Sequence, residues 1–217
     1  MKRTGLALIA TALIGWAGTA GAGIVSAMQY ANDTAFSTAT GAVSLTGPLP
    51  DVGAQGTSTV LGDATLSAGN TIFVGAGWSS LMPGGNAIAI SGPENLDIAL
   101  NTGLASAFGF YFHEPGSNTG QLDGCNTACV DSAFEIDFYR GGMLLGTQAF
   151  DPPHDVLYFF GIILDEAFDE VRFRETVGSN DNEFYGEMYV KPVPEPAALL
   201  LTALGLLALG VTRRTRR

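Results

Sequence analysis

The sequence has few basic residues and few charges of any kind. Its 217 residues include 10 Lys and Arg against 21 Asp and Glu, and only 14% of all residues are charged. This balance argues against nucleic-acid binding, because neutralising phosphates requires clustered Lys and Arg. The length fits one domain of ordinary size. The 47% hydrophobic and 10% aromatic residues argue against general disorder, since they can form a core.

Histidine is also scarce, and the common catalytic motifs are absent. The two histidines, His113 and His154, do not belong to an H-E-x-x-H zinc pattern. The sequence has no G-x-S-x-G nucleophile elbow, no G-x-G-x-x-G turn and no P-loop. We therefore expect both histidines to be solvated loop residues, and we do not predict an enzyme.

Cysteine occurs twice, at Cys125 and Cys129, in a polar stretch. The spacing is not C-x₂-C and no second pair exists, which disfavours a zinc site or a thioredoxin-type active site. We predict a disulfide between the two cysteines, which would hold a local turn rather than the whole fold. A disulfide requires an oxidising compartment outside the cytoplasm.

The first 22 residues have the pattern of a secretory signal peptide. The charged start Met1-Lys2-Arg3 is followed by an apolar run from Gly5 to Ala17 and by the small residues Ala20-Gly21-Ala22. The apolar run is short for a membrane span. We predict Sec-dependent export and cleavage after Ala22, with Val25-Ser26-Ala27 as an alternative site.

The C-terminal segment, residues 192–217, combines a short apolar run with a basic end. An uncharged run of 15 residues extends from Ala197 to Val211, and four of the last five residues are arginine. At about 1.5 Å per residue the run covers about 22 Å, less than the roughly 30 Å hydrocarbon core of a bilayer. We predict a short transmembrane helix whose basic end stays in the cytoplasm.

The motif Pro194-Glu195-Pro196 stands directly before the apolar run. In order and spacing, this motif, the short apolar helix and the arginine-rich end resemble the PEP-CTERM sorting signal of Gram-negative bacteria that make exopolysaccharide. The resemblance implies that an exosortase, a membrane cysteine protease, recognises the motif and removes the tail. The protein would then be anchored in the inner membrane only transiently. The tail indicates the route of the protein and not its activity.

The body between the two ends has the pattern of antiparallel β-structure. Short runs rich in Phe, Val, Ile and Thr are separated by Gly, Pro, Asn and Asp. In one run Phe134, Ile136 and Phe138 would share a face, with Glu135 and Asp137 on the other. The predicted strands are Ser58–Leu66, Thr71–Trp78, Ala87–Ser91, Leu96–Leu100, Ala105–Phe112, Ala133–Tyr139, Met143–Phe150, Val156–Leu164, Phe168–Arg174 and Glu183–Val190.

These strands predict an all-β fold, an antiparallel β-sandwich over residues 57–191. Before it, residues 23–56 are rich in Ala, Thr, Gly, Ser and Pro, and we expect an irregular segment with at most one strand. Leu157–Leu164 is nearly all apolar, which predicts a central strand covered on both faces. The stretch Arg140–Met143 contains Gly-Gly and predicts a hairpin turn.

The second half of the body, Leu104 to Val190, contains in order the segments FGFYF, DGCNTACVD, FEIDFYRGG, YFFGIILDEAFDEVRFRE and SNDNEFYGEMYV. This order resembles bodies that are common among PEP-CTERM proteins and look like jelly-roll carbohydrate-binding modules, which implies a jelly-roll-like sandwich. Such modules often carry a structural calcium ion. The oxygen-rich stretch Ser179–Glu183 offers hard donors for this ion, and we name Asp181 and Glu183 as the first residues to test.

The mature body would be strongly acidic, because six of the ten basic residues lie in the two ends. With four basic and 21 acidic residues its formal charge is −17, a surface that repels anionic polymers. Acidic pairs such as Glu135 and Asp137 could serve glycoside hydrolysis, but chance pairs are expected in so acidic a chain. The candidates for an exposed sugar-stacking ring are Trp78, Tyr111, Tyr139, Tyr158 and Tyr185, although such rings more often pack in cores.

We therefore predict an exported protein of the cell surface or extracellular matrix with a non-catalytic structural or adhesive role. Its predicted partners are an exosortase and exopolysaccharide, and nucleic acid is not among them. Two alternatives remain at this point. One is a secreted carbohydrate-active enzyme on a jelly roll, and the other is an unprocessed, membrane-anchored periplasmic protein. The sequence does not identify the residues that bind a ligand.

Overall fold

The computed structural model of the chain describes residues 23–115, 132–153, 155–178 and 183–194. The predicted signal peptide, both cysteines, His154 and Asp181 lie outside these residues. So does the tail from Glu195 onwards, including Pro196. The described part of the chain contains no helix that is long and apolar enough to cross a bilayer.

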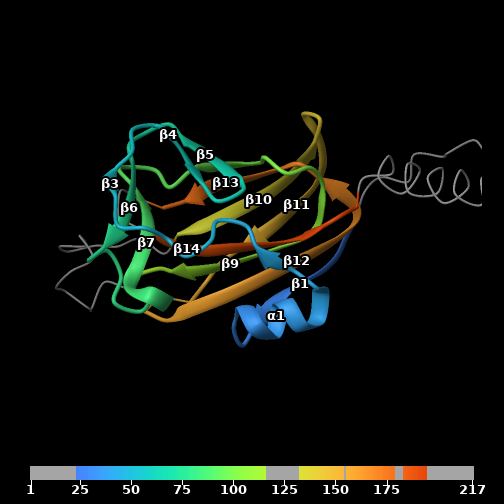
Figure 1. Ribbon diagram of the computed structural model, residues 1–217, viewed down its shortest axis with the longest axis horizontal. Coiled ribbons are helices and arrows are strands. Elements are labelled where there is room, and N and C mark those ends of the chain that lie inside the picture. The colour runs from blue at the N-terminus through green and yellow to red at the C-terminus, as the bar shows by residue number, and fades with distance from the viewer. Residues whose placement is uncertain (1–22, 116–131, 154, 179–182, 195–217) are drawn as a thin grey trace, which may run out of the picture.

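The described residues form two antiparallel sheets packed face to face (Figure 1), which confirms the predicted β-sandwich. The order of the eight-stranded sheet is β1-β12-β9-β14-β7-β6-β3, with β2 paired to β14, and that of the six-stranded sheet is β11-β10-β13-β8-β5-β4. The elements are β1 (Ile24–Tyr30), α1 (Asp33–Thr40), β2 (Val43–Ser44), β3 (Gly53–Ala54), β4 (Ser58–Leu61), β5 (Ala64–Ala68), β6 (Ile72–Ala76), η1 (Pro83–Gly85), β7 (Asn86–Ile90), β8 (Leu96–Leu100), β9 (Ala105–His113), β10 (Ala133–Arg140), β11 (Met143–Phe150), β12 (Leu157–Phe168), β13 (Glu170–Val177) and β14 (Phe184–Pro192).

Two predictions about the first third of the chain are wrong. The predicted strand Ser58–Leu66 is a hairpin of β4 and β5 that turns at Gly62. Gly62 has φ 54°, and a Cβ there would lie 2.4 Å from the carbonyl oxygen of Leu45, so only glycine fits this turn. The segment expected to be irregular contains β1, α1, β2 and β3. These elements are too short to show a clear hydrophobic period.

Aromatic side chains fill the space between the sheets. Phe134 and Phe138 of β10 are buried as the alternation predicted, while Glu135 between them is exposed. Phe110 of β9 lies opposite, and its ring centroid is 4.9 Å from that of Phe173 in β13. Burying one such side chain contributes about 1.5–3 kcal/mol relative to leaving it exposed. This core therefore supplies most of the free energy that holds the two sheets together.

Part of the outer face of the eight-stranded sheet, around β1, β9 and β14, is covered by α1 (Figure 1). Phe36 of α1 is fully buried over Gly109 of β9 and Gly161 of β12, which are direct cross-strand neighbours. A Cβ on either glycine would lie 2.6 Å from a carbon of the Phe36 ring. The two glycines thus form a socket that lets an aromatic ring approach the backbone of the sheet. Because β12 is covered by the core on its other face, the predicted central strand is confirmed.

A hydrogen-bonded carboxylate fixes the start of α1 on the sheet. Asp33 accepts hydrogen bonds from the hydroxyls of Tyr111 (2.9 Å) and Tyr189 (2.8 Å). Partial burial alone would raise the pKa of Asp33, but these two hydrogen bonds hold it below its ordinary value. Burial, together with the nearby Asp33 carboxylate, raises the pKa of Tyr111 to about 12. The same causes raise the pKa of Tyr189. The ionised carboxylate and the neutral phenols are therefore the favoured forms.

Candidate functional site

The outer face of the six-stranded sheet carries a row of polar side chains that crosses all six strands. In the strand register Asp137 lies between Thr147 and Arg172, and Asp97 lies between Arg172 and Ser67. Ser58 continues the row on the last strand. Neighbouring strands are about 4.8 Å apart, so the row is about 24 Å long. This face offers a long polar track across the strands.

The centre of this face is formed by β10, β13 and β8, and we call their outward side chains the platform. The platform consists of Glu135, Asp137, Tyr139, Glu170, Arg172, Arg174 and Asp97. Its charged groups remain partly in contact with solvent, since the side chains of Arg174 and Asp97 are 33% and 41% exposed. A ligand could therefore reach them directly.

Arg172 is held from two sides. Its Nε and Nη2 donate to the two carboxylate oxygens of Glu170 at 2.7 and 3.0 Å. Its guanidinium carbon lies 4.1 Å from the ring centroid of Tyr139, which is a cation–π contact. The hydrogen bond to Glu170 raises the pKa of Arg172 despite slight burial. These contacts fix the positions of one cation, one carboxylate and one aromatic ring relative to each other.

A second ion pair lies beside the first. Arg174 Nη2 is 2.5 Å from Asp97 Oδ1. Asp137 accepts a hydrogen bond of 2.5 Å from the hydroxyl of Thr147. The platform thus presents fixed donors and acceptors on a sheet surface, which suits a ligand with many hydroxyl groups, because each hydroxyl can both donate and accept.

Only one of the aromatic candidates from the sequence lies on the platform, namely Tyr139. Tyr185 is fully buried and donates to the carbonyl oxygen of Glu94 at 2.7 Å, and Tyr111 is the buried partner of Asp33. The half-buried Trp78 packs on Phe73, and the half-buried Tyr158 packs on Phe150. The burial of these four rings follows from contacts between distant strands, which the sequence pattern does not reveal.

The carboxylate candidates Glu135 and Asp137 share the outward face of β10, as predicted. In the register Glu135 lies opposite Arg174, and Asp137 lies opposite Arg172. Glu135 is exposed, and Asp137 accepts a hydrogen bond from Thr147. Both carboxylates therefore offer acceptors to the hydroxyl groups of a ligand.

The sequence analysis missed a set of buried acids near the loops at one end of the sandwich. Glu94, Glu114 and Glu183 are at most 1% exposed. The backbone N–H of Ser132 donates to Glu114, and its hydroxyl donates to Glu183. Glu183 is thus buried next to a second acid, but among the residues that the structure describes no group of three or more His, Cys, Asp or Glu is placed to hold a metal ion. The calcium site stays a prediction.

His113 corrects another expectation. It is not a solvated loop residue, because it ends β9 and is only 4% exposed. Its Nδ1 is 2.8 Å from the hydroxyl oxygen of Ser79. The strand continues one residue beyond the Phe-rich run, and this places the imidazole against the ring of Phe184 in the neighbouring strand β14. His113 therefore has a structural position.

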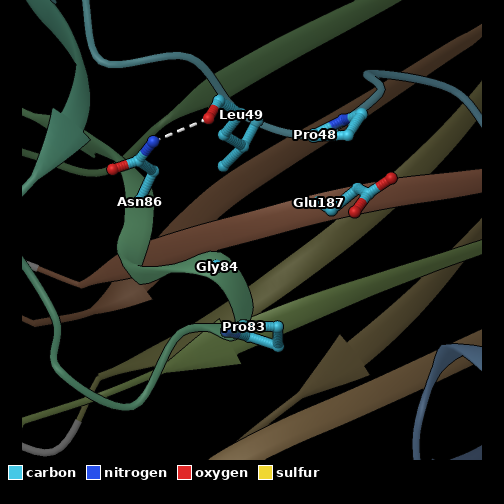
Figure 2. Close-up of a pocket in the computed structure, with 6 residues that line it drawn as sticks. All are labelled: Pro48, Leu49, Pro83, Gly84, Asn86 and Glu187. Carbon is cyan, nitrogen blue, oxygen red and sulfur yellow. Dashed lines mark hydrogen bonds between the residues drawn. The ribbon is translucent and has the colours of Figure 1, made fainter.

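A small pocket opens above β14 on the other sheet (Figure 2). Its volume is about 200 Å³, which is below the roughly 300–1,000 Å³ that is usual for ligand sites. The Asn86 side-chain amide donates to the carbonyl oxygen of Leu49 at 2.7 Å, and Glu187 accepts from Ser44. The lining residues are Pro48, Leu49, Pro83, Gly84, Asn86 and Glu187. The pocket is small, and the side chains of Asn86 and Glu187 already form hydrogen bonds within the protein. We therefore regard the platform as the better candidate site.

A comparison with protein-family models finds no match to this sequence, and a comparison with curated proteins finds none either. Among solved structures the chain is similar to a family 29 carbohydrate-binding module, with 12% identity, a TM-score of 0.36, and coverage of 69% of this chain and 86% of that one. It is similar to a xylan-binding domain of family 22 with 12% identity, a TM-score of 0.37, and coverage of 65% and 96%. It is also similar to a structure of the CBM32-1 and CBM32-2 domains of Clostridium perfringens ZmpB, with 12% identity, a TM-score of 0.36, and coverage of 77% and 40%. Similarities of this size assign no ligand and no site to this chain.

Proposed function

We propose that this protein binds polysaccharide through the platform and does no chemistry on it. The observation that carries the proposal is the fixed group of Tyr139, Arg172 and Glu170 on an accessible sheet face. The ring supplies apolar surface for the C–H groups of a sugar. The charged groups around it supply strong, oriented hydrogen bonds to hydroxyls. The polar row across six strands gives a chain-like ligand several places to bind.

Affinity electrophoresis in gels that contain soluble polysaccharides tests this proposal. We expect retardation by at least one polysaccharide, and we expect Tyr139→Ala and Arg172→Ala to weaken it at least tenfold. Arg140→Ala is the matched control, because Arg140 is an exposed arginine at the end of the same strand as Tyr139. Retardation that survives both platform substitutions would contradict the proposal. Release of new reducing ends by the unaltered protein would favour the enzyme alternative instead.

We further propose that the protein reaches its site by export and exosortase processing. The features in support are the signal-like N-terminus and the tail with its Pro194-Glu195-Pro196 motif. The intact mass of the protein from its own host tests this route. Loss of residues 1–22 and of about 25 C-terminal residues is the expected result, while a retained Arg217 would support the anchored alternative. A gain of about two mass units upon reduction would show the proposed Cys125–Cys129 disulfide.

A structural calcium ion is part of this proposal. Glu183 supplies hard oxygen donors, and Glu183 is buried, so a bound ion would contribute to folding stability. We expect the melting temperature to rise with CaCl₂ and to fall with EDTA, and Glu183→Gln to remove most of that difference. Equal melting temperatures in both solutions would contradict the proposal.

A further inference from the structure

The platform contains half of the basic residues of the predicted mature body. Only Arg140, Arg172, Arg174 and Lys191 lie between residues 23 and 194. Arg172 and Arg174 are two residues apart on β13, so both point outward from the same strand. Any anionic ligand bound on the platform would have to be neutralised by these two side chains.

The edge of the Arg172 guanidinium group that best binds a carboxylate is occupied by Glu170. Nε and Nη2 form two parallel hydrogen bonds to Glu170. This is the same two-pronged arrangement by which arginine binds a carboxylate or phosphate ligand. One flat face of the group also lies over the Tyr139 ring. A carboxylate on a ligand would therefore have to compete with Glu170 for the same two atoms.

Arg174 is engaged through single atoms, since its Nη2 forms an ion pair with Asp97 and its Nη1 donates to the carbonyl oxygen of Phe173. The platform as a whole holds four acids and two arginines, a formal charge of −2. The two acids without a described ion pair, Glu135 and Asp137, lie next to the arginines in the register. An approaching anion thus meets net negative charge, whereas an uncharged hydroxyl meets donors and acceptors that are already oriented.

We propose, building on the function proposed above, that the platform accepts uncharged polysaccharide and rejects chains that carry carboxylates. Glu170 and Asp97 are then the residues that determine this specificity, because they hold the two arginines. Removing either carboxylate releases one guanidinium group and changes the ligand class toward anionic chains. A polysaccharide-binding surface whose arginines face the ligand freely would show the opposite preference.

The test compares matched ligands on the full chain. Each soluble neutral polysaccharide of a panel is used together with its own derivative in which the primary hydroxyls are oxidised to carboxylates. We expect at least one neutral polymer to bind, and its carboxylated derivative to bind at least tenfold more weakly at low salt. Raising the salt concentration should narrow this difference, because it screens the repulsion.

Two variants provide the decisive part of the test. Asp97→Asn and Glu170→Gln should each raise the affinity for the carboxylated polymer at least threefold. Asp63→Asn and Glu166→Gln change the net charge equally at sites away from the platform, and they should leave this affinity unchanged. Equal gains in the control variants, or a wild-type protein that prefers the carboxylated form, would overturn the inference. If no polymer of either form binds, the proposed function itself fails.

Discussion

The two sheets of this sandwich treat their outer faces in opposite ways. The eight-stranded sheet buries part of its outer face under α1, where Phe36 fits into the socket of Gly109 and Gly161. The six-stranded sheet leaves its outer face accessible and fills it with ion pairs. The face under α1 stabilises the fold, because removing apolar surface from water is favourable. The accessible face contributes little stability, because exposed ion pairs gain little, and so it is available for binding.

The largest expected effect is on the covered face. Phe36→Ala should lower the free energy of unfolding by about 3–5 kcal/mol, because it removes a buried ring and leaves a cavity between α1 and the sheet. Urea denaturation measures this loss. Val60→Ala is the control, since Val60 is 62% exposed and should change stability by less than about 0.5 kcal/mol. A loss for Phe36→Ala as small as that of the control would mean that α1 does not stabilise the sheet.

The next largest effect is expected when a methyl group is added to the socket under Phe36. Gly161→Ala should cost about 1–3 kcal/mol, because its Cβ would lie 2.6 Å from the Phe36 ring. Gly69→Ala is the matched control, with no atom within 4 Å of its added Cβ. In the double variant with Phe36→Ala the loss should be smaller than the sum of the two single losses. Additive losses would show that the ring and the glycine do not interact.

A smaller effect should depend on pH. The folded state lowers the pKa of Asp33, so its carboxylate stabilises the fold above the ordinary pKa and this contribution disappears as the pH falls through the lowered value. The folded state raises the pKa of Tyr111 to about 12, so the contribution of the neutral phenol is present below pH 10 and disappears toward pH 12. Asp33→Asn should therefore be less stable than wild type at neutral pH.

The difference in the free energy of unfolding between wild type and Asp33→Asn should become smaller as the pH falls. Chemical denaturation at several pH values between 7 and about 2 measures it, with Asp63→Asn as a control for the loss of one surface charge. A difference that stays constant over this whole range would contradict a role for the ionised Asp33 carboxylate.

The smallest effect belongs to the accessible face. Arg172→Ala should change the free energy of unfolding by less than about 1 kcal/mol, because its ion pair with Glu170 is partly solvated. The same substitution should still abolish most polysaccharide binding. A large loss of stability in Arg172→Ala would contradict the view that the accessible face contributes little to stability.

Much of the second half of the fold could be predicted from period-2 alternation. The bounds of Met143–Phe150 agree with the structure, and the alternation placed Glu135 and Asp137 on the outward face. The position of α1 could not be predicted, because eight residues give too short a helical pattern. Nor could the ion pair of Arg174 with Asp97, which joins strands far apart in the sequence. The signal for the socket was present only as two glycines inside apolar strands.

The pairing of the first strands with the last has a consequence for how the chain folds. Tyr30 in β1 pairs with Phe159 in β12, and Ser44 in β2 pairs with Tyr189 in β14. Contacts between residues so distant in sequence form slowly, because a long loop must close before any of them stabilises the chain. During synthesis, β1 and α1 emerge long before their partners, with Phe36 still in water. Cooperative folding must therefore wait until nearly the whole body is available.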